Sequence, residues 1–407
     1  MVIEGCASPR VANLSEPCII LAAATETPTR LHLGRARRPL HRDKPLKPRV
    51  FDPTTSLDHV RLEAQKLAFA PLVFQSSRAL RDLGALDIAR DAGTHGITAQ
   101  LFATHATVSL YAANVLLEAG LAAGLLGYEE RAEGRTFIIT KLGAYWNRDP
   151  MTRVNAEFSH HVCYRGAFRL EDALRGGIPA GLPTLGAHAT VYEGLAALDS
   201  DIREAWLGFD HFYSDGIFDA CLAEIPEGVG HLVDIGANTG KFSRLFAERR
   251  TNARVTLVDL PGQIALAKAN VETSPARERL SFHPDDMLSS DRPLPTADAY
   301  WMSQFLDCFS EDQIVAILRR VRDVMTPDAR VYIVETFWDR QKYEAARYCV
   351  IATSLYFACI ANGDSRMYHS EDFRALVERA GLSIERECHD KGMSHSFLCC
   401  RRVPLPC

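Results

Sequence analysis

The sequence has no run of apolar residues approaching the roughly 18 that a membrane-spanning helix needs. It also has little excess charge, because 46 Lys and Arg stand against 51 Asp and Glu over 407 residues. A net charge of −5 gives no electrostatic reason to expect a nucleic-acid or membrane partner. Its eleven cysteines are scattered, without the spacing of a zinc site or a compact disulfide framework. We therefore expect free thiols in a reducing cytoplasm, no metal and no membrane span.

The first 54 residues lack the pattern of a folded domain. The stretch "CIILAAAT" resembles the apolar core of a signal peptide, but Glu4 and Glu16 precede it and the usual positive region is poor. Residues 30–49 then hold eight Lys or Arg against one Asp, which predicts a disordered basic arm over residues 1–54. We interpret the arm as a solvated tail, or as the result of a start codon placed too early, and not as a secretion signal.

Residues 55–150 show helical periodicity and then a short β pattern. Thr98 is a candidate N-cap, and "YEERAEGRTFIITKLGAYW" predicts two strands around the turn "AEGR". Helices followed by a hairpin are the order of a winged helix. The candidate recognition helix, "ATVSLYAANVLLEAG", offers Asn114 and no Lys or Arg to base edges. We therefore predict a winged-helix-like dimerisation domain, all-helical apart from the hairpin, that forms a homodimer and binds no nucleic acid.

The rest of the chain predicts a helical connector and then an α/β domain. Residues 151–225 contain "LEDALRGGIPAG" and the aromatic helix "AWLGFDHFYSDGIF", which suit either a pocket wall or core packing. Over residues 226–407, the strand candidates "HLVDIG", "RVTLVDL", "LSFHP", "DAYWMSQ" and "RVYIVET" alternate with helical segments. Alternation of this kind predicts a doubly wound parallel sheet. The last two strands, "LSIERECHD" and "SHSFLCCR", are too close for a crossover, so we expect an antiparallel hairpin at the sheet edge.

The turn after the first of these strands, from Gly236 to Gly240, has Asn238 at its middle. A dinucleotide-binding turn would carry glycine there, so that the backbone can approach a pyrophosphate. Asp234 would also place a negative charge beside a diphosphate. Both features count against NAD and favour a cofactor with a cationic amine and no phosphate, such as S-adenosylmethionine. Asp259 ends the next strand, where an acidic side chain can accept both ribose hydroxyls.

Several motifs together resemble the S-adenosylmethionine-dependent O-methyltransferases that include plant phenolic and hydroxyindole enzymes. They are "LVDIGANTG", "TLVDLPG", "HPDDML", "FLDCFSEDQIVAIL", "VYIVET" and "NGDSRMYHSEDFRALVERAGL". The resemblance covers about residues 57–401. It implies a class I methyltransferase fold, a dimerising first domain and S-adenosylmethionine as cofactor. We expect the cofactor to contact Asp234, Gly236, Asn238, Gly240, Asp259, Leu260, Asp286, Met287 and Ser303.

The family usually has a histidine base in a segment resembling "LHDWSDED", and alignment on "IVAIL" puts Asp307 at that position. A buried aspartate with a raised pKa can act as a base, although Asp307 could equally bind the substrate or cap the following helix. Glu335 matches the acidic position that orients the base. We expect substrate contacts from His160, His161, Phe305, Tyr348 and Tyr356.

The sequence therefore predicts methyl transfer to a hydroxyl of an aromatic or polyketide-like small molecule. An alternative keeps the fold and cofactor for C-methylation, decarboxylation or hydroxylation, which the missing histidine makes reasonable. A winged-helix regulator that senses a metabolite is the alternative from another class.

Overall fold

The computed structural model describes residues 55–403, apart from residues 133 and 394. The arm predicted over residues 1–54 lies outside this part of the chain. The eight cysteines within it are all free thiols.

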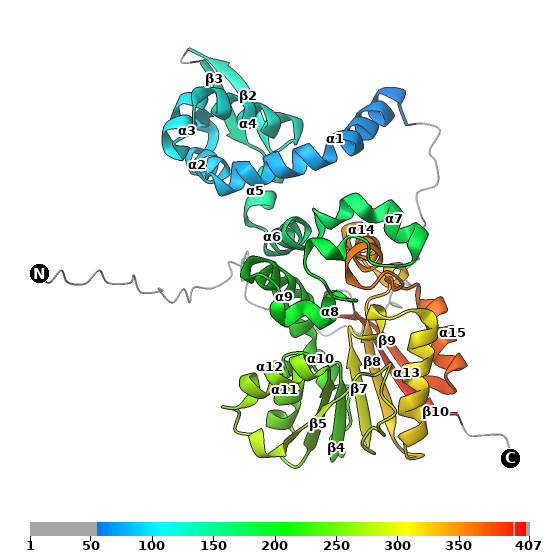
Figure 1. The fold of residues 1–407 in the computed structure, drawn as a ribbon. Helices are drawn as coiled ribbons and strands as arrows, with labels where there is room; N and C mark the ends of the chain where they lie inside the picture. Colours follow the sequence, from blue (N-terminus) through cyan, green and yellow to red (C-terminus); the bar gives the residue numbers. More distant parts are fainter. Residues whose placement is uncertain (1–54, 133, 394, 404–407) are drawn as a thin grey trace, which may run out of the picture. The chain divides into compact units, whose positions relative to one another are not determined.

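A seven-stranded sheet forms the centre of the C-terminal domain, in the order β6-β5-β4-β7-β8-β10-β9 (Figure 1). Its strands are β4 (His231–Ile235), β5 (Arg254–Asp259), β6 (Leu280–Pro284), β7 (Ala299–Ser303), β8 (Arg330–Glu335), β9 (Leu382–Lys391) and β10 (His395–Arg402). The pairs from β6 to β8 are parallel, and β10 is antiparallel to both β8 and β9. The predicted doubly wound sheet with an antiparallel C-terminal hairpin is confirmed.

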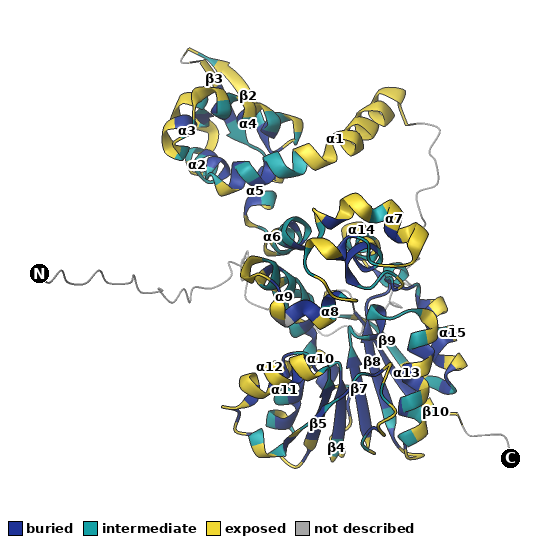
Figure 2. Ribbon diagram, viewed as in Figure 1, coloured by how far each residue is buried: buried dark blue, intermediate teal, exposed yellow. Residues whose placement is uncertain are grey.

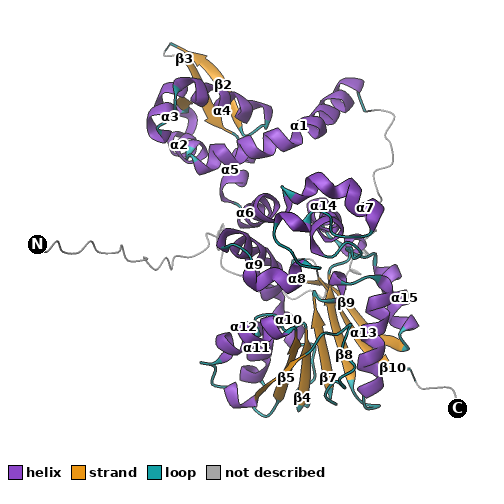
Figure 3. Ribbon diagram, viewed as in Figure 1, coloured by secondary structure: helices purple, strands orange, loops and turns teal. Residues whose placement is uncertain are grey.

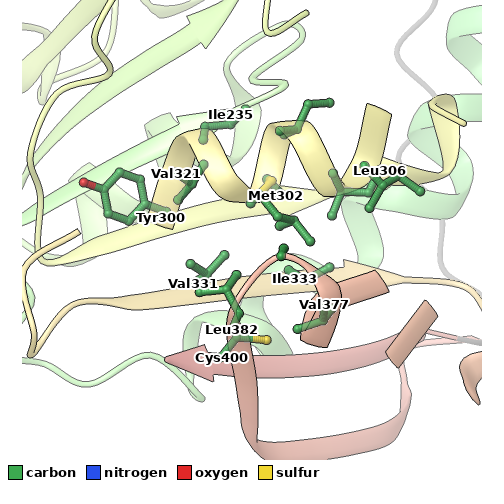
Figure 4. Close-up of a cluster of buried hydrophobic side chains, with 14 of the residues drawn as sticks. Ile235, Tyr300, Met302, Leu306, Val321, Val331, Ile333, Val377, Leu382 and Cys400 are labelled. Atoms are coloured by element: carbon green, nitrogen blue, oxygen red, sulfur yellow. The ribbon is translucent and has the colours of Figure 1, made fainter. Parts of the chain in front are cut away.

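Helices cover both faces of this sheet, so its central strands are buried on both sides (Figure 2). The principal helices are α11 (Lys241–Arg249), α12 (Pro261–Val271), α13 (Glu311–Val324) and α15 (Ser370–Arg379). Successive residues of a strand point to opposite faces. Tyr300 and Met302 of β7 therefore pack in one core cluster with Val321 of α13 (Figure 4). Trp301 packs in the other cluster, stacked on Phe242 of α11 with ring centroids 3.9 Å apart.

The N-terminal domain is mainly helical. It consists of α1 (Leu57–Asp82), α2 (Ala85–Ala92), β1 (Ile97–Thr98), α3 (Ala99–Ala106), α4 (Leu110–Ala122), β2 (Leu126–Arg131) and β3 (Gly134–Ile139). The side chain of Thr98 accepts a hydrogen bond from the Leu101 amide and caps α3. The β2–β3 hairpin lies where the sequence predicted it, but β1 adds a third strand. Two residues are too few to show strand alternation, so the pattern missed β1.

The segment between β3 and β4 consists of helices and turns, and one more helix lies between β8 and α15 (Figure 3). These helices are α5 (Lys141–Arg148), α6 (Pro150–Glu157), α7 (Leu170–Gly176), α8 (Val191–Gly194), α9 (Ser200–Ser214), α10 (Phe218–Leu222) and α14 (Glu344–Tyr356). A third apolar cluster contains residues of α7, α8, α9, α14 and the turn Phe158–Cys163, whereas α5 and α10 pack in other clusters. In the described part of the chain, only the segment Glu344–Ala361 is long and apolar enough to cross a membrane. Val350, Tyr356 and Ile360 of this segment are buried in the third cluster. We therefore interpret it as a core helix of this domain.

Replacing Gly181 with alanine is expected to destabilise the connector. A Cβ atom at Gly181 would lie 2.6 Å from the carbonyl oxygen of Gly166 and 2.8 Å from its Cα, and backbone atoms cannot rotate away. Overpacking of this kind costs about 1–3 kcal/mol of unfolding free energy, measurable by denaturant titration. Gly208 of α9 is the control, because its Cβ would meet nothing within 4 Å. Gly208→Ala should be neutral or stabilising by up to about 1 kcal/mol, and equal effects would contradict the packing account.

Candidate active site

The turn between β4 and α11 runs through three residues with positive φ. Gly236 has φ 76°, Asn238 φ 48° and Gly240 φ 77°. A Cβ at Gly236 would lie 2.3 Å from the ring of Phe305, so both space and backbone conformation require glycine there. Asparagine tolerates the left-handed region better than most side chains, which explains why Asn238 can occupy the middle of the turn.

Asn238 also ties the turn to two other elements. Its backbone amide donates to Asp259 Oδ2 at 2.8 Å, and its Nδ2 donates to Asp210 Oδ2 at 2.8 Å. Asp259 ends β5 and also accepts the amide of Leu260. Asp210 comes from α9 in the connector. No motif pointed to Asp210, because its position beside the turn depends on how α9 packs.

The turn and the ends of the neighbouring strands line a cavity of about 1500 Å³. Ten of the predicted site residues lie on its wall: Gly236, Asn238, Asp259, Leu260, Asp286, Met287, Phe305, Asp307, Tyr348 and Tyr356. The cavity extends from the strand ends to the connector helices and α14. One cavity therefore holds both the predicted cofactor side and the predicted acceptor side.

Three residues expected to contact the cofactor do not line this cavity. Asp234 is 3% exposed and accepts a hydrogen bond from the Ser243 hydroxyl at 2.5 Å, so it stabilises the start of α11. Gly240 is the N-cap residue of α11 and does not line the cavity. Ser303 has a buried hydroxyl without a partner, and the next residue, Gln304, reaches the wall instead. Direct cofactor contacts from Asp234, Gly240 and Ser303 stay predictions, although these residues lie off the cavity wall.

Gln304 is a feature that the sequence analysis missed. It has φ 48°, a strained conformation for a residue other than glycine, of the kind that clusters at functional sites. The backbone amide of Gln304 donates to the carbonyl of Val334 at 2.8 Å. Gln304 lines the cavity, and its Oε1 is buried without a hydrogen-bond partner in the described part of the chain.

Carboxylates at the turn have raised pKa values because they are buried. Burial raises the pKa of Asp259 to about 6, with a further contribution from the negative charge of Asp210. Burial likewise raises the pKa of Asp210 to about 6, opposed by nearby His211. A cationic ligand in the cavity would favour the charged form of both groups. The glycine turn and the adjacent carboxylates thus fit a cofactor with ammonium, sulfonium and ribose hydroxyl groups.

Asp307 and Glu335 form a second acidic pair. Asp307 is 5% exposed, and burial together with the charge of Asp210 raises its pKa to about 7, although the Cys308 thiol donates to it. Glu335 is 1% exposed and accepts the backbone amides of Phe305 at 3.2 Å and Leu306 at 2.9 Å. Burial, and then the charge of Asp307, raise the pKa of Glu335 well above its ordinary value. Glu335 does not line the cavity; it holds the segment that carries Asp307.

Aromatic side chains form the opposite wall. Phe158 stacks on Phe209 with ring centroids 4.0 Å apart and meets Tyr356 edge-on at 4.9 Å. Trp206 Nε1 donates to the Tyr356 hydroxyl at 2.7 Å. All four line the cavity, so the acceptor side can hold a flat apolar molecule. Tyr348, by contrast, is 73% exposed and stands at the cavity's edge.

Neither histidine predicted to contact the substrate reaches the cavity wall. His161 Nε2 lies 3.3 Å from Glu157 Oε2, and Glu157 also pairs with Arg78. Burial, and then the positive charge of Arg78, lower the pKa of His160. The π-helical turn Phe158–Cys163 instead points Phe158, Ser159 and Cys163 into the cavity. The periodicity of an ordinary α-helix could not predict which side chains of this turn face the cavity.

Strand order, glycine turn and acidic strand ends together define a class I methyltransferase fold. Comparison with known families matches residues 220–383 to an O-methyltransferase domain and residues 61–133 to a Dimerisation2-like domain. Residues 220–383 are therefore similar to an O-methyltransferase domain, and residues 61–133 ahead of them are similar to a dimerisation domain.

Individual relatives are distant. Mouse acetylserotonin O-methyltransferase is 29% identical over 174 residues, which cover 42% of this chain and 43% of that protein. Norreticuline-7-O-methyltransferase of Papaver somniferum is 24% identical over 229 residues, covering 56% and 60%. The chain thus spans about half the length of these curated relatives. The solved structure of a mitomycin 7-O-methyltransferase superposes with a TM-score of 0.65 at 20% identity, covering 85% of this chain and 98% of that one, which supports the fold.

Proposed function

We propose that this protein is an S-adenosylmethionine-dependent methyltransferase that acts on a hydroxyl of an aromatic or polyketide-like small molecule. The observation that carries the proposal is the shared cavity, whose wall includes the glycine turn, Asp259, Asp307 and a group of aromatic side chains. Cofactor and acceptor can therefore meet in one enclosure that limits access of water.

Residues of the strand ends would hold the cofactor. Asp259 would accept the ribose hydroxyls, with Leu260 beside it, and Asp286 and Met287 would contact the adenine, since all four residues line the cavity. When bound, S-adenosylmethionine supplies an electrophilic methyl group on a sulfonium whose leaving group is neutral. The side chain of Arg320 fixes the adenine side, because it pairs with Asp285 at 2.5 Å and donates to the carbonyl of Asp286 at 3.2 Å.

Asp307 is proposed as the group that accepts the proton of the acceptor hydroxyl. A phenol has a pKa of about 10 and is mostly protonated at neutral pH, so a base is needed as the oxygen attacks. A carboxyl whose pKa lies near 7 is matched to that task. Glu335 is a positioning residue, since its hydrogen bonds to two backbone amides fix the turn before Asp307.

Calorimetry and methyl-transfer assays test this function directly. The full chain should bind S-adenosylmethionine, and incubation with labelled cofactor and a panel of phenols and polyketide acids should give O-methylated product. No binding at millimolar cofactor would overturn the proposal. Bound cofactor with decarboxylated or hydroxylated products would replace methylation by one of those reactions.

We also propose a cytoplasmic homodimer formed through the N-terminal domain. The matched dimerisation domain has exposed apolar side chains on α3 and α4, including Leu101 at 52%, Tyr111 at 79% and Val115 at 47% exposure. Apolar groups gathered in this way indicate a surface that a partner covers.

Analytical ultracentrifugation should show a dimer. The double variant Leu101→Asp/Tyr111→Asp should shift it toward monomer, because two charges would have to be buried in the interface. The variant Tyr128→Asp serves as control, since Tyr128 is 53% exposed on the β2–β3 hairpin, outside the α3–α4 surface. A monomeric wild type, or a dimer unaffected by the double variant, would contradict this assembly.

A further inference from the structure

The cavity wall has an unusual balance of charge. Eight acidic side chains line it: Glu193, Asp210, Asp259, Asp285, Asp286, Asp307, Asp364 and Asp390. The only cationic side chain on the wall, among the described residues, is Lys342, which is exposed. A carboxylate on the acceptor would lose hydration in this enclosure and meet like charges, with no buried cationic side chain on the described wall to pair with it.

Part of this negative charge is balanced, either by a cationic side chain or by the proposed cofactor. Asp285 pairs with Arg320, and Asp210, Asp259 and Asp286 lie at the cofactor side. S-adenosylmethionine carries a sulfonium, an ammonium and a carboxylate, so its net charge of about +1 offsets only one of those acids. The cavity stays negative when the cofactor is bound.

Glu193 and Asp364 make no ion pair within the part of the chain that the structure describes. Both are exposed while lining the cavity, which places them at its opening. Burial raises the pKa of the Asp364 carboxyl, with no cation acting against it. Asn362 links the Asp364 segment to the Asp307 turn, because its Nδ2 donates to the Cys308 carbonyl at 2.5 Å and its Oδ1 accepts the Asp364 amide at 3.3 Å.

Aromatic rings line the same cavity as these free acids. Tyr192 precedes Glu193 in α8 and lines the cavity, as do Trp206 and Phe209. Aromatic faces attract cations, by about 0.5–1 kcal/mol at exposed sites and about 2 kcal/mol or more when water is excluded. Unpaired carboxylates next to aromatic faces are the chemistry that binds an alkylammonium group attached to a ring system.

Resting on the proposed methyltransferase function, we propose that the acceptor is an aromatic molecule that bears a basic nitrogen and no carboxylate. The ring lies against the aromatic wall with its hydroxyl toward Asp307, and the protonated amine lies at the cavity opening, where Glu193 and Asp364 supply the negative charge. This inference narrows the substrate class, since the fold by itself is compatible with phenols, polyketide acids and amines alike.

Three probes on one ring system test it: 2-(1-naphthyl)ethylamine, 2-(1-naphthyl)ethanol and 1-naphthylacetate. Their affinities are measured by calorimetry on the full chain saturated with S-adenosylhomocysteine. We expect the amine to bind at least about 10-fold more tightly than the carboxylate, equivalent to 1.4 kcal/mol, with the alcohol between them. Equal affinities, or no binding of the amine at millimolar concentration, would overturn the inference.

Two double variants locate the effect. In Glu193→Gln/Asp364→Asn, the preference for the amine should fall at least about threefold, while binding of the alcohol is unchanged. Asp219→Asn/Glu227→Gln removes the same two charges from exposed positions outside the cavity and should retain the preference. An equal loss in both variants would reduce the effect to net charge and overturn the site. Failure of S-adenosylhomocysteine to bind would instead refute the proposed function, so the two failures are distinguishable.

Discussion

Asp307→Asn is expected to lower kcat by about 10²–10⁴-fold, the usual contribution of a general base, with little change in cofactor affinity. The amide cannot accept the proton of the acceptor hydroxyl. The wild-type enzyme should show kcat/KM rising with pH through about 7, the pKa of Asp307, because only the deprotonated carboxylate acts as a base. The variant should lose this rising limb. Steady-state kinetics from pH 5.5 to 9 measure both effects.

Stability provides a second readout for Asp307. Its folded-state pKa lies above the ordinary value, so the protonated form favours the fold, and this contribution is lost as pH rises through about 7. Asp307→Asn keeps the site neutral and should therefore melt at a higher temperature than wild type at pH 8, but not at pH 5. A purely structural role predicts lower stability with activity retained within a few-fold, and that result would remove Asp307 from the base role.

Cys308→Ala tests the same base without removing its carboxyl group. The thiol donates to Asp307 at 3.5 Å and lowers the pKa of that carboxyl. Without the thiol, the rising limb of kcat/KM should move to higher pH while the plateau remains. An unchanged profile would mean that Asp307 does not control the limb.

Asp259→Ala is expected to weaken S-adenosylmethionine binding by about 100-fold or more. The variant removes the acceptor proposed for the ribose, and it leaves the amides of Asn238 and Leu260 without their partner. Each hydrogen bond to a charged group is worth about 1.5–3 kcal/mol. Loss of two such bonds to the ribose hydroxyls would therefore lower the cofactor affinity by more than a factor of 100. Calorimetry measures the affinity, and Asp259→Asn, which keeps one acceptor oxygen, should show a smaller loss.

Asp234→Asn provides the contrast, because Asp234 is also an aspartate of a neighbouring strand but lies behind the turn. Its carboxylate contacts Ser243 and not the cavity, and an amide oxygen can still accept that hydroxyl. Cofactor affinity should stay within a few-fold of wild type. A loss as large as that of Asp259→Ala would restore Asp234 to the direct role that the sequence suggested.

The sequence by itself determined the fold class. Strand and helix periodicities predicted the parallel sheet, and the short link between "LSIERECHD" and "SHSFLCCR" predicted the antiparallel hairpin, because connection length limits strand direction. Gly236 and Asn238 were identifiable because positive φ restricts residue type. Asp259 was identifiable because ligands collect at the carboxyl ends of parallel strands. These are local constraints, which a linear pattern records.

Only the tertiary structure decided which polar groups meet. Asp210 reaches Asn238 because α9 packs over the turn, and nothing in the sequence around Asp210 indicates that contact. Gln304 lines the cavity in place of Ser303 because adjacent residues at a strand end point in different directions. His160 and His161 turn away because a π-helical turn changes the registration of their helix. The charge balance of the cavity is likewise a sum over distant segments, so its preference for an amine emerges from packing and not from any single motif.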